Sequence, residues 1–310
     1  MQNIERVSGF VPVGGKGKRL QPLTNRWAKP ALLMGSGDSR IMDYSLEVLK
    51  GTASTFVSLY THSEIIRHCL GEKERNKRLI ILEDSYLGNI GGSLLQHHEI
   101  IAQQASDYIL IIPGDHVIEG LDISGLVGDA IEKRASITVV LDPRATYGEY
   151  LHYRPQDNLV DRVVRHRGPN EIAYTGISLF RSNFLLSRIK KELTTSGDLA
   201  VLDVTNQIIF PKIENDQVFA YVLPTESHWD DTGTIDRYYL NNIRFSKGKN
   251  VVAQNAGVGQ GVKIEKTIVL DNARLEGDCH IVNAIIAPGT RVRNLKKTDS
   301  RISVIWSQEK

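Results

Sequence analysis

The sequence has little of several features that define large classes of proteins. Cys69 and Cys279 are its only cysteines, and they lie far apart without the spacing of a metal site. Two such cysteines indicate a reducing cytoplasm rather than a disulfide scaffold. No run approaches the ~20 apolar residues of a membrane-spanning helix, and the first residues lack the basic and apolar pattern of a signal peptide.

Negative charge is missing from one part of the chain. The net charge of the whole chain is only +2, which argues against a nucleic-acid-binding protein or a membrane-surface protein. However, no acidic residue lies between Glu5 and Asp38, and lysines and arginines gather there in the glycine-rich stretch VGGKGKRLQPLTNRWAKP, residues 13–30. The positive charge is therefore local, and it indicates a small anion as its target.

The rest of the chain reads as an ordinary globular protein of 310 residues with 41% apolar residues, enough for one large domain or two smaller ones. Apolar runs alternate with amphipathic helical patterns over the first part of the chain. Strands are expected at 7–13, 55–61, 78–84, 107–115 and 136–142, and helices at 40–50 and 123–134. Short apolar strands separated by helices predict a Rossmann-like α/β fold, with a mostly parallel sheet and helices on both faces.

The C-terminal part follows another pattern. The segments VVAQNAGV (251–258), IVLDNARL (268–275) and IIAPGTRV (285–292) align at a spacing of 17 residues. This period predicts a β-solenoid of stacked coils, with a three-strand antiparallel cap as the alternative. So small a stack needs support from the first domain or from another subunit. We therefore predict an α/β domain at 1–246 and a short, hexapeptide-like left-handed β-helix at 247–310.

The basic glycine stretch has the chemistry of a phosphate cradle. Glycines let backbone amides approach an anion closely, and lysine and arginine add full charges. Two common phosphate motifs do not fit, because GGKGKRLQ has no Gly-Lys-Ser/Thr and Leu20 stands where the dinucleotide motif needs glycine. A solvated basic turn is the plain alternative. Both this loop and Asp115 lie at the carboxyl ends of predicted strands, at the sheet edge where ligands bind in such folds.

The longer pattern resembles the signature of the sugar-1-phosphate nucleotidyltransferases, the nucleotide-sugar pyrophosphorylases. The likeness rests on Arg19, Pro22-Leu23-Thr24 and Lys29-Pro30, and on the segments PGDHVI (113–118) and HWDDTGTIDRYYLNN (228–242). NRWAKPALLMGSGDSRIMDYSLEVLK is most similar to the ADP-glucose pyrophosphorylase branch. The resemblance covers residues 8–245, which makes 1–246 the expected catalytic domain, and the solenoid tail fits the family too.

The resemblance implies transfer of a nucleoside monophosphate from an NTP to a sugar 1-phosphate, with Mg²⁺ as cofactor. ATP is the first nucleotide to expect, while GTP, UTP and dTTP stay open, and neither nucleic acid nor membrane is an expected partner. A cytoplasmic homo-oligomer is expected. The alternative is a non-catalytic paralogue that senses nucleotide sugars.

Site residues follow from the same resemblance. The predicted catalytic residues are Arg19, Lys29 and Asp115, of which the two cations bind the triphosphate. Asp115 and Asp231 match the magnesium ligands, Asp230 is the residue most easily mistaken for Asp231, and a supporting role is kept open for His116. The predicted nucleotide-binding residues are Gly14, Gly15, Lys16, Gly17, Gly88 and Gly114, with Gly88 accepting the nucleobase. The predicted sugar-phosphate residues are Gly148, Glu149, Arg165, Arg167, Thr175 and Gly176.

One departure from the family pattern concerns the sugar phosphate. The family carries Glu-Lys-Pro before the segment that contains Gly176, and its lysine holds the sugar phosphate. Here the region reads VVRHRGPNEIAYTG (163–176), with Pro169 present but no Glu-Lys before it. Arg165 or Arg167 is expected to supply the charge, although guanidinium and ammonium differ in reach and geometry.

Overall fold

The computed structural model describes residues 3–35, 37–71, 73, 78–168, 170–196, 201–213, 215 and 217–306. These residues form two compact units. The first unit comprises Met1–Gly15, Tyr44–Ser63 and Leu70–Asp231, and the second comprises Lys16–Asp43, Glu64–Cys69 and Thr232–Lys310. The domain division at 1–246 and 247–310 stays a prediction, since the second unit combines the C-terminal coils with segments from earlier in the chain.

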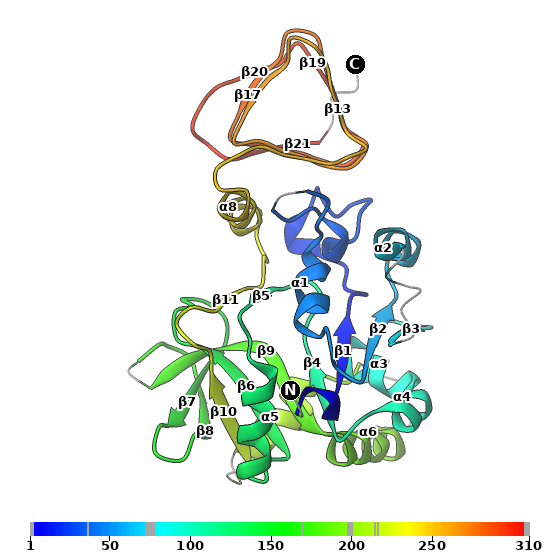
Figure 1. The fold of residues 1–310 in the computed structure, drawn as a ribbon, viewed down its shortest axis with the longest axis vertical. Coiled ribbons are helices and arrows are strands. Elements are labelled where there is room, and N and C mark those ends of the chain that lie inside the picture. Colours follow the sequence, from blue (N-terminus) through cyan, green and yellow to red (C-terminus); the bar gives the residue numbers. More distant parts are fainter. Residues whose placement is uncertain are drawn as a thin grey trace. The chain divides into compact units, whose positions relative to one another are not determined.

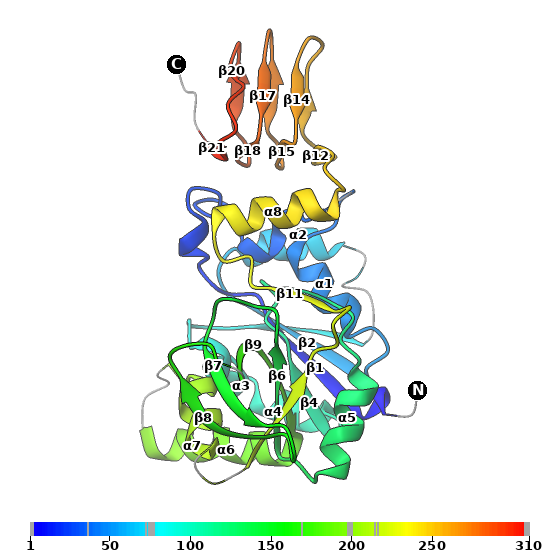
Figure 2. The same cartoon turned by 90° about the vertical axis from the view of Figure 1, so that its left-hand side faces the viewer.

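The first unit is built on a nine-stranded sheet in the order β3-β2-β1-β4-β9-β6-β10-β8-β7 (Figures 1 and 2). Its strands are β1 (Val7–Pro12), β2 (Ser54–Leu59), β3 (Leu79–Glu83), β4 (Tyr108–Ile111), β6 (Ile137–Asp142), β7 (Tyr150–Arg154), β8 (Leu159–Val164), β9 (Glu171–Arg181) and β10 (Val218–Val222). β5 (Val117–Glu119) and β11 (His228–Asp230) form a separate antiparallel pair. The five strands expected from the sequence are confirmed, each with bounds shifted by a few residues.

Most strands of the large sheet share one direction. β1, β2, β3 and β4 form a parallel block, and β6 is parallel to β10. β8 and β9 run against them, so every ladder that involves β8 or β9 is antiparallel. The expectation of an α/β fold around parallel strands is thus confirmed, and the reversed strands β8 and β9 are an addition to it.

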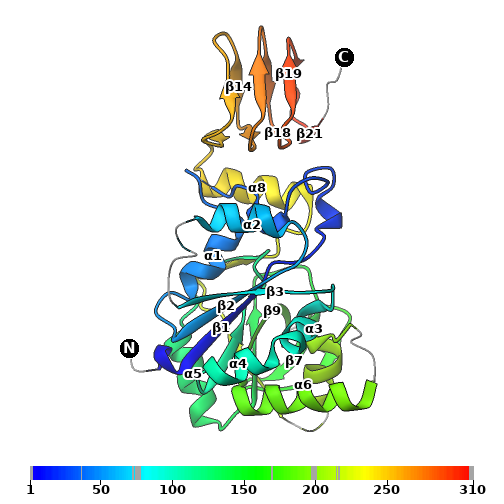
Figure 3. The ribbon, with the colours of Figure 1, turned by 90° about the vertical axis from the view of Figure 1, so that its right-hand side faces the viewer.

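From β1 to β4, helices lie between successive strands as the sequence patterns indicate, whereas β6, β7, β8 and β9 follow one another with no helix among the described residues between them. The helices are α1 (Ile41–Val48), α2 (Ser63–Leu70), α3 (Asn89–Gln96), α4 (His98–Gln104), α5 (Ile123–Glu132), α6 (Ser182–Ser196), α7 (Phe210–Ile213) and α8 (Ile235–Phe245), with a π-helix at Val204–Ile209 and 3₁₀ turns at Ile4–Arg6, Lys18–Leu20 and Lys29–Ala31. α3, α4 and α6 pack together, whereas α5 contacts β10 (Figure 3). The helices expected at 40–50 and 123–134 correspond to α1 and α5.

The C-terminal coils form three parallel ladders, and Figure 1 shows their triangular outline. The ladders are made of β12 (Val251–Val252), β15 (Ile268–Val269), β18 (Ala284–Ile286) and β21 (Ser303–Ile305); of β13 (Gly257–Val258), β16 (Arg274–Glu276) and β19 (Arg291–Arg293); and of β14 (Lys263–Glu265), β17 (His280–Val282) and β20 (Lys296–Lys297). Val251 pairs with Ile268, and Ile268 pairs with Ile285, so the 17-residue period is the coil repeat. The parallel register excludes the antiparallel cap, while the left-handed turn stays a prediction.

Each unit has its own apolar core. In the first unit, the core gathers side chains such as Phe10, Phe56, Ile109 and Phe180, all almost fully buried. In the coils, Leu275, Ile281 and Ile286 fill the interior together with the buried thiol of Cys279. Cys69 and Cys279 are both free thiols. No helix in the described part of the chain is long and apolar enough to cross a membrane.

Candidate active site

The beginning of the glycine loop and Asp115 lie at neighbouring strand ends in the first unit. β1 and β4 are parallel, with Phe10 opposite Ile111. Continued by four residues on both strands, this register sets Gly14 level with Asp115. The amide of Gly114 donates a hydrogen bond of 3.1 Å to the carbonyl of Pro12, which confirms that the two chains stay side by side beyond the strands.

The glycines at this edge serve different purposes. A Cβ at Gly114 would lie 2.4 Å from Cγ1 of Val13, and one at Gly14 would lie 2.9 Å from Cβ of Tyr60, so packing requires both glycines. A Cβ at Gly15 would meet no described heavy atom within 4 Å, and Gly15 is exposed. The backbone at Gly15 is therefore the part of this loop that is open to an incoming anion.

The second unit carries the rest of the basic loop. Gly17 has a φ of 58°, a left-handed conformation that suits glycine, and it precedes the 3₁₀ turn Lys18–Leu20. The hydroxyl of Thr24 donates to the carbonyl of Gly17 at 2.9 Å, and a Cβ at Gly17 would lie 3.2 Å from Cβ of Lys29. Gly17 therefore turns the loop closely past Lys29. Lys29 itself is buried, whereas Lys16, Lys18 and Arg19 are exposed.

The small β5–β11 ladder of the first unit brings the segments that follow or precede the two predicted magnesium ligands side by side. Asp230 pairs with Val117 in this antiparallel ladder, so one further step sets Asp231 opposite His116 and beside Asp115. Ser45 Oγ donates to the carbonyl of Pro113 at 3.1 Å and holds the segment before Asp115.

The residues at this point fit a magnesium ion. Among the described residues, no group of three or more His, Cys, Asp or Glu side chains could enclose a metal. Two carboxylates, with the remaining positions left to phosphate oxygens and water, are the donor set that Mg²⁺ prefers at sites for phosphorylated substrates. Asp115 and Asp231 are the residues that would hold it.

Asp230 and Asp231 differ in their surroundings. Asp230 is buried, and the hydroxyl of Tyr147 donates to its Oδ2 at 2.7 Å. The Tyr147 ring in turn stacks on Trp229, with ring centroids 5.5 Å apart. Asp231 is half-buried. Asp230 is thus buried and accepts an internal hydrogen bond, and Asp231 stays the predicted metal ligand.

His116 connects Trp229 with Asp115. Nε1 of Trp229 donates to Nδ1 of His116 at 3.2 Å, with the rings edge to face at 5.7 Å. Since Nδ1 accepts this bond, the proton of the neutral imidazole lies on Nε2, which is 3.7 Å from Oδ1 of Asp115. His116 thus presents a donor toward the carboxylate.

The glycine turn expected to accept the nucleobase is closely packed against a later segment. Gly88 immediately precedes α3, and its carbonyl accepts hydrogen bonds from the amides of Gly92 at 2.9 Å and Leu202 at 3.2 Å. The amide of Gly91 donates to the carbonyl of Leu202 at 3.0 Å, and a Cβ at Gly91 would lie 2.5 Å from Leu202. The missing side chain of Gly91 therefore lets the turn pack against Leu202 of the same chain.

The buried carboxylate of Asp84 links the end of β3 to α3 and the residue after it, next to the same turn. Asp84, just after β3, accepts hydrogen bonds from Ser93 at 2.8 Å and contacts Nε2 of His97 at 3.0 Å. Burial raises the pKa of Asp84, and its contacts with Ser93 and His97 oppose that rise. The hydroxyl of Tyr86, in the turn, is buried and meets no hydrogen-bond partner among the described residues.

Two glycines of the segments expected at the sugar have positive φ: Gly148 (φ 100°), just before β7, and Gly176 (φ 77°), inside β9 where its register with β6 shifts. Partial burial raises the pKa of Glu149, and the negative charge of Asp203 raises it further. The hydroxyl of Thr175 is buried and donates to the carbonyl of Val140 at 2.8 Å, so the predicted bond to a sugar hydroxyl competes with an internal one.

The two arginines expected to replace the missing lysine follow β8. Arg165 and Arg167 are both exposed. Nη2 of Arg167 donates to the carbonyl of Pro143 at 2.5 Å, which fixes Arg167 next to the strand that leads to Gly148. Pro169 lies outside the described residues.

Comparison with known proteins supplies the family. The family model described as nucleotidyl transferase matches residues 9–246. The chain belongs to the nucleotidyl transferase family. It is 26% identical over 270 residues to a glucose-1-phosphate adenylyltransferase of Rhizobium radiobacter, an alignment that covers 76% of this chain and 63% of the relative. It is 28% identical over 283 residues to the enzyme of that name from Shewanella frigidimarina, covering 78% of this chain and 66% of the relative. The chain thus spans under two thirds of the length of the first of these relatives.

Sequence reasoning missed several residues of this nucleotidyl transferase. Tyr147 contacts Asp230, the neighbour of the predicted ligand Asp231, and Trp229 contacts His116, for which a supporting role is kept open. Asp203 approaches the predicted sugar residue Glu149. Tyr147 directly precedes the predicted residue Gly148, and Trp229 lies in the recognised segment 228–242, so sequence signals were near both residues without assigning them a role. Asp203 carried no such signal, because its nearness to Glu149 arises from chain segments far apart in the sequence.

Proposed function

We propose that this nucleotidyl transferase moves a nucleoside monophosphate from an NTP to a sugar 1-phosphate and releases pyrophosphate. The observation that supports the proposal is the register of β1 with β4 and of β5 with β11, which, continued past the strand ends, leads Gly14, Asp115 and Asp231 to the same edge of the sheet. The names of the relatives make ATP and glucose 1-phosphate the first pair to test. GTP, UTP and dTTP remain alternatives for the nucleotide.

The reaction needs charge and positioning more than acid–base chemistry. An oxygen of the sugar phosphate forms a bond to the α-phosphorus, the bond from that phosphorus to the bridging oxygen breaks, and pyrophosphate leaves with the electron pair. No proton has to move, since the attacking phosphate is already anionic. The main barrier is the repulsion between two polyanions, which fixed cations and backbone amides lower.

The chain's own groups divide this work. Gly15 and Lys16 offer backbone amides and charge to the triphosphate, and Arg19 and Lys29 neutralise its phosphates. Mg²⁺, held by Asp115 and Asp231, would supply charge neutralisation at the phosphoryl group under attack. His116, through its Nε2 proton, orients the carboxylate of Asp115.

We assign the binding of the sugar 1-phosphate to residues in and around β7, β8 and β9. Gly148, Glu149 and Gly176 would line the sugar, and Arg165 or Arg167 would take the place of the family lysine at its phosphate. A guanidinium can bind two phosphate oxygens at once, so the phosphate would bind in a different position from the one it takes at a lysine. An unusual acceptor sugar is consistent with that change.

Assembly and location are part of the proposal. The coils are proposed to wind left-handed and to support a homo-oligomer, because stacked coils end in unpaired backbone groups and Trp306, near the last coil, is 58% exposed. The free thiols of Cys69 and Cys279 suit a reducing compartment such as the cytoplasm.

A pyrophosphate-release matrix tests the proposed function. Purified protein with Mg²⁺ is mixed with each NTP and each of a panel of sugar 1-phosphates, and release is expected for at least one pair. Absence of release with every pair would overturn the proposal. Binding of a nucleotide sugar without turnover would instead identify a non-catalytic paralogue, and Asp115→Asn should then leave that binding largely in place.

A further inference from the structure

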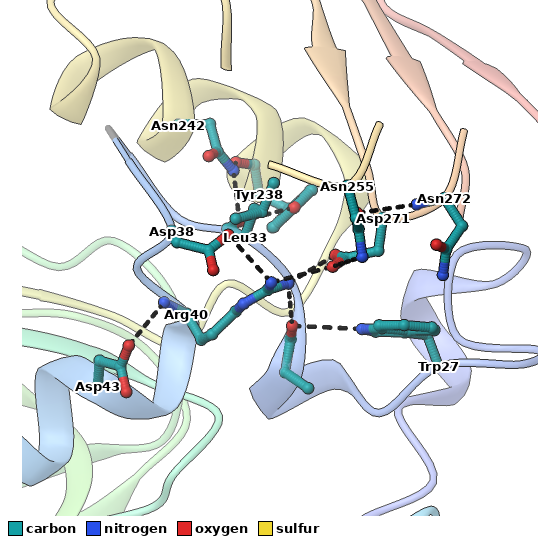
Figure 4. Close-up of polar contacts among 11 residues, drawn as sticks. Trp27, Leu33, Asp38, Arg40, Asp43, Tyr238, Asn242, Asn255, Asp271 and Asn272 are labelled. Atoms are coloured by element: carbon teal, nitrogen blue, oxygen red, sulfur yellow. Dashed lines mark hydrogen bonds and ion pairs between the residues drawn. The ribbon is translucent and has the colours of Figure 1, made fainter. Parts of the chain in front are cut away.

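A buried ion pair joins the C-terminal coils to Arg40, and both partners belong to the second unit. Nη1 of Arg40 lies 2.5 Å from Oδ2 of Asp271, and Nη2 lies 2.9 Å from Oδ1, so the contact is bidentate (Figure 4). The two side chains are only 8% and 3% exposed. Asp271 belongs to the turn between β15 and β16, in the second coil.

The surroundings keep the guanidinium of Arg40 charged. Burial alone would lower the pKa of Arg40, but the hydrogen bond and the charge of Asp271 raise it overall. Nδ2 of Asn255, one coil earlier, donates to Oδ1 of Asp271 at 3.3 Å, and Nη2 of Arg40 also reaches Asp38 at 3.2 Å. A pair so enclosed has a defined geometry, because each charge is expensive to bury without the other.

Arg40 also contacts the 3₁₀ turn that contains Lys29. Its Nη1 also donates to the carbonyl of Ala31 at 3.1 Å, and Nε1 of Trp27 donates to the same oxygen at 3.3 Å (Figure 4). Ala31 is the last residue of the 3₁₀ turn Lys29–Ala31. One guanidinium therefore holds an aspartate of the coils and the end of the lysine's own turn.

Further contacts hold Leu33 and Arg40, on either side of this connection. Leu33 and Arg40 form an antiparallel bridge. The carbonyl of Leu33 also accepts hydrogen bonds from the hydroxyl of Tyr238 at 2.7 Å and from Nδ2 of Asn242 at 3.4 Å, both on α8. A shift of Arg40 would thus be transmitted to the lysine turn through its contacts with Ala31 and Leu33.

We propose that Asp271 and Arg40 are positioning residues for nucleotide binding: the coil holds the arginine, and the arginine sets the turn from which Lys29 reaches the triphosphate. The proposal rests on the proposed function, since it concerns the NTP and not the sugar phosphate. It gives the C-terminal coils a part in the reaction without any contact between the coils and the substrate.

The test separates positioning from stability. Asp271→Asn leaves the guanidinium buried without its counter-charge and can unfold the protein. The decisive variant is therefore the double substitution Arg40→Met with Asp271→Leu, since apolar residues of similar volume can replace a buried ion pair without loss of stability. Asp278→Asn, in an exposed ion pair with Lys296 on the same coils, is the matched control.

Two measurements are made on the wild type and on each variant, with the melting temperature as a check on folding. The first is the KM for the NTP against the KM for the sugar 1-phosphate. The second is hydrogen exchange of the amides of residues 31–34 without nucleotide. For the folded double variant, we expect the KM for the NTP to rise at least about fivefold, the KM for the sugar phosphate to stay unchanged, and exchange at 31–34 to accelerate. Asp278→Asn should match the wild type in all of these.

The outcomes are distinguishable. Wild-type values of both the NTP KM and the exchange rates in the double variant would overturn the proposal. Faster exchange with an unchanged KM for the NTP would also overturn it, because the pair would then serve only structure. Failure of the wild type itself to release pyrophosphate with any substrate pair would mark the failure of the proposed function instead.

Discussion

The indole of Trp229 fixes the tautomer of His116 by donating to its Nδ1 at 3.2 Å, and His116 in turn faces Asp115 with Nε2. A residue of β11 therefore determines what a residue beside a predicted magnesium ligand can donate. The arrangement is the one found around many metal sites, where a neighbour of the ligand sets its orientation.

Removing this indole donor should weaken metal use. Trp229→Phe keeps an aromatic ring against Tyr147 but leaves Nδ1 of His116 without its donor. We expect the Mg²⁺ concentration for half-maximal pyrophosphate release to rise about tenfold, with a small change in melting temperature. Trp306→Phe, at an exposed position, is the control. Equal Mg²⁺ dependence in the wild type and in Trp229→Phe would show that the indole has no part in metal binding.

Substitutions of Asp115, Asp231 and Asp230 should have different effects on kcat. Asp115→Asn and Asp231→Asn each remove a proposed metal ligand, and each should lower kcat by about 10²-fold or more. Asp230→Asn keeps an oxygen that can accept from Tyr147, so activity should stay within a few-fold of the wild type. If Asp230→Asn were the inactive variant and Asp231→Asn the active one, the assignment of the second ligand would have to be exchanged.

Substitutions at Gly114 and Gly15 should have different effects, the first on stability and the second on nucleotide binding. Gly114→Ala puts a Cβ 2.4 Å from Val13, and overpacking of this kind should reduce the free energy of unfolding by about 1–3 kcal/mol. Gly15→Ala meets no described atom within 4 Å, so stability should be nearly unchanged while the KM for the NTP rises. Denaturant unfolding and steady-state kinetics measure the two effects. A stable Gly114→Ala protein would contradict the packing argument.

Glu149 should make folding stability depend on pH. Its pKa in the folded protein is raised above the ordinary value of 4.5, by partial burial and by Asp203, so the folded state holds the proton more tightly than the unfolded state. The contribution of this group to stability is therefore complete below pH 4.5 and is lost as the pH rises through the raised pKa. The free energy of unfolding of the wild type, minus that of Glu149→Gln, should fall over this window. A difference that rises with pH would show that the shift has the opposite sign.

The sequence predicted the elements whose signal is local. The strands before Gly14 and before Asp115 are apolar runs that end at glycine or proline, and β1 and β4 follow them closely. The coil period could be read because stacked strands repeat the same apolar positions, as Val251, Ile268 and Ile285 do. The parallel block and the solenoid coils therefore needed little beyond periodicity.

Contacts between distant segments could not be predicted in this way. β9 is an apolar run like its neighbours, and nothing within Glu171–Arg181 shows that it pairs antiparallel with both β4 and β6. Arg40 and Asp271 are 231 positions apart, and Tyr147 and Asp230 are 83 apart, so no local spacing links either pair. Thr175 shows the converse case. Its motif indicated contact with a ligand, whereas in the fold its hydroxyl donates a hydrogen bond to the carbonyl of Val140.

The coil repeat sets rules for changing the length of the tail. Coils added after β21 would extend the ladders at the far end and leave Asp271 where Arg40 meets it. One extra repeat inserted between β12 and β15 would instead carry Asp271 away by one strand spacing of about 4.8 Å, and the residue of the new coil would face the guanidinium in its place. Growth of this tail, in evolution or by design, is therefore tolerated in one direction only, unless the inserted repeat brings an acidic residue of its own.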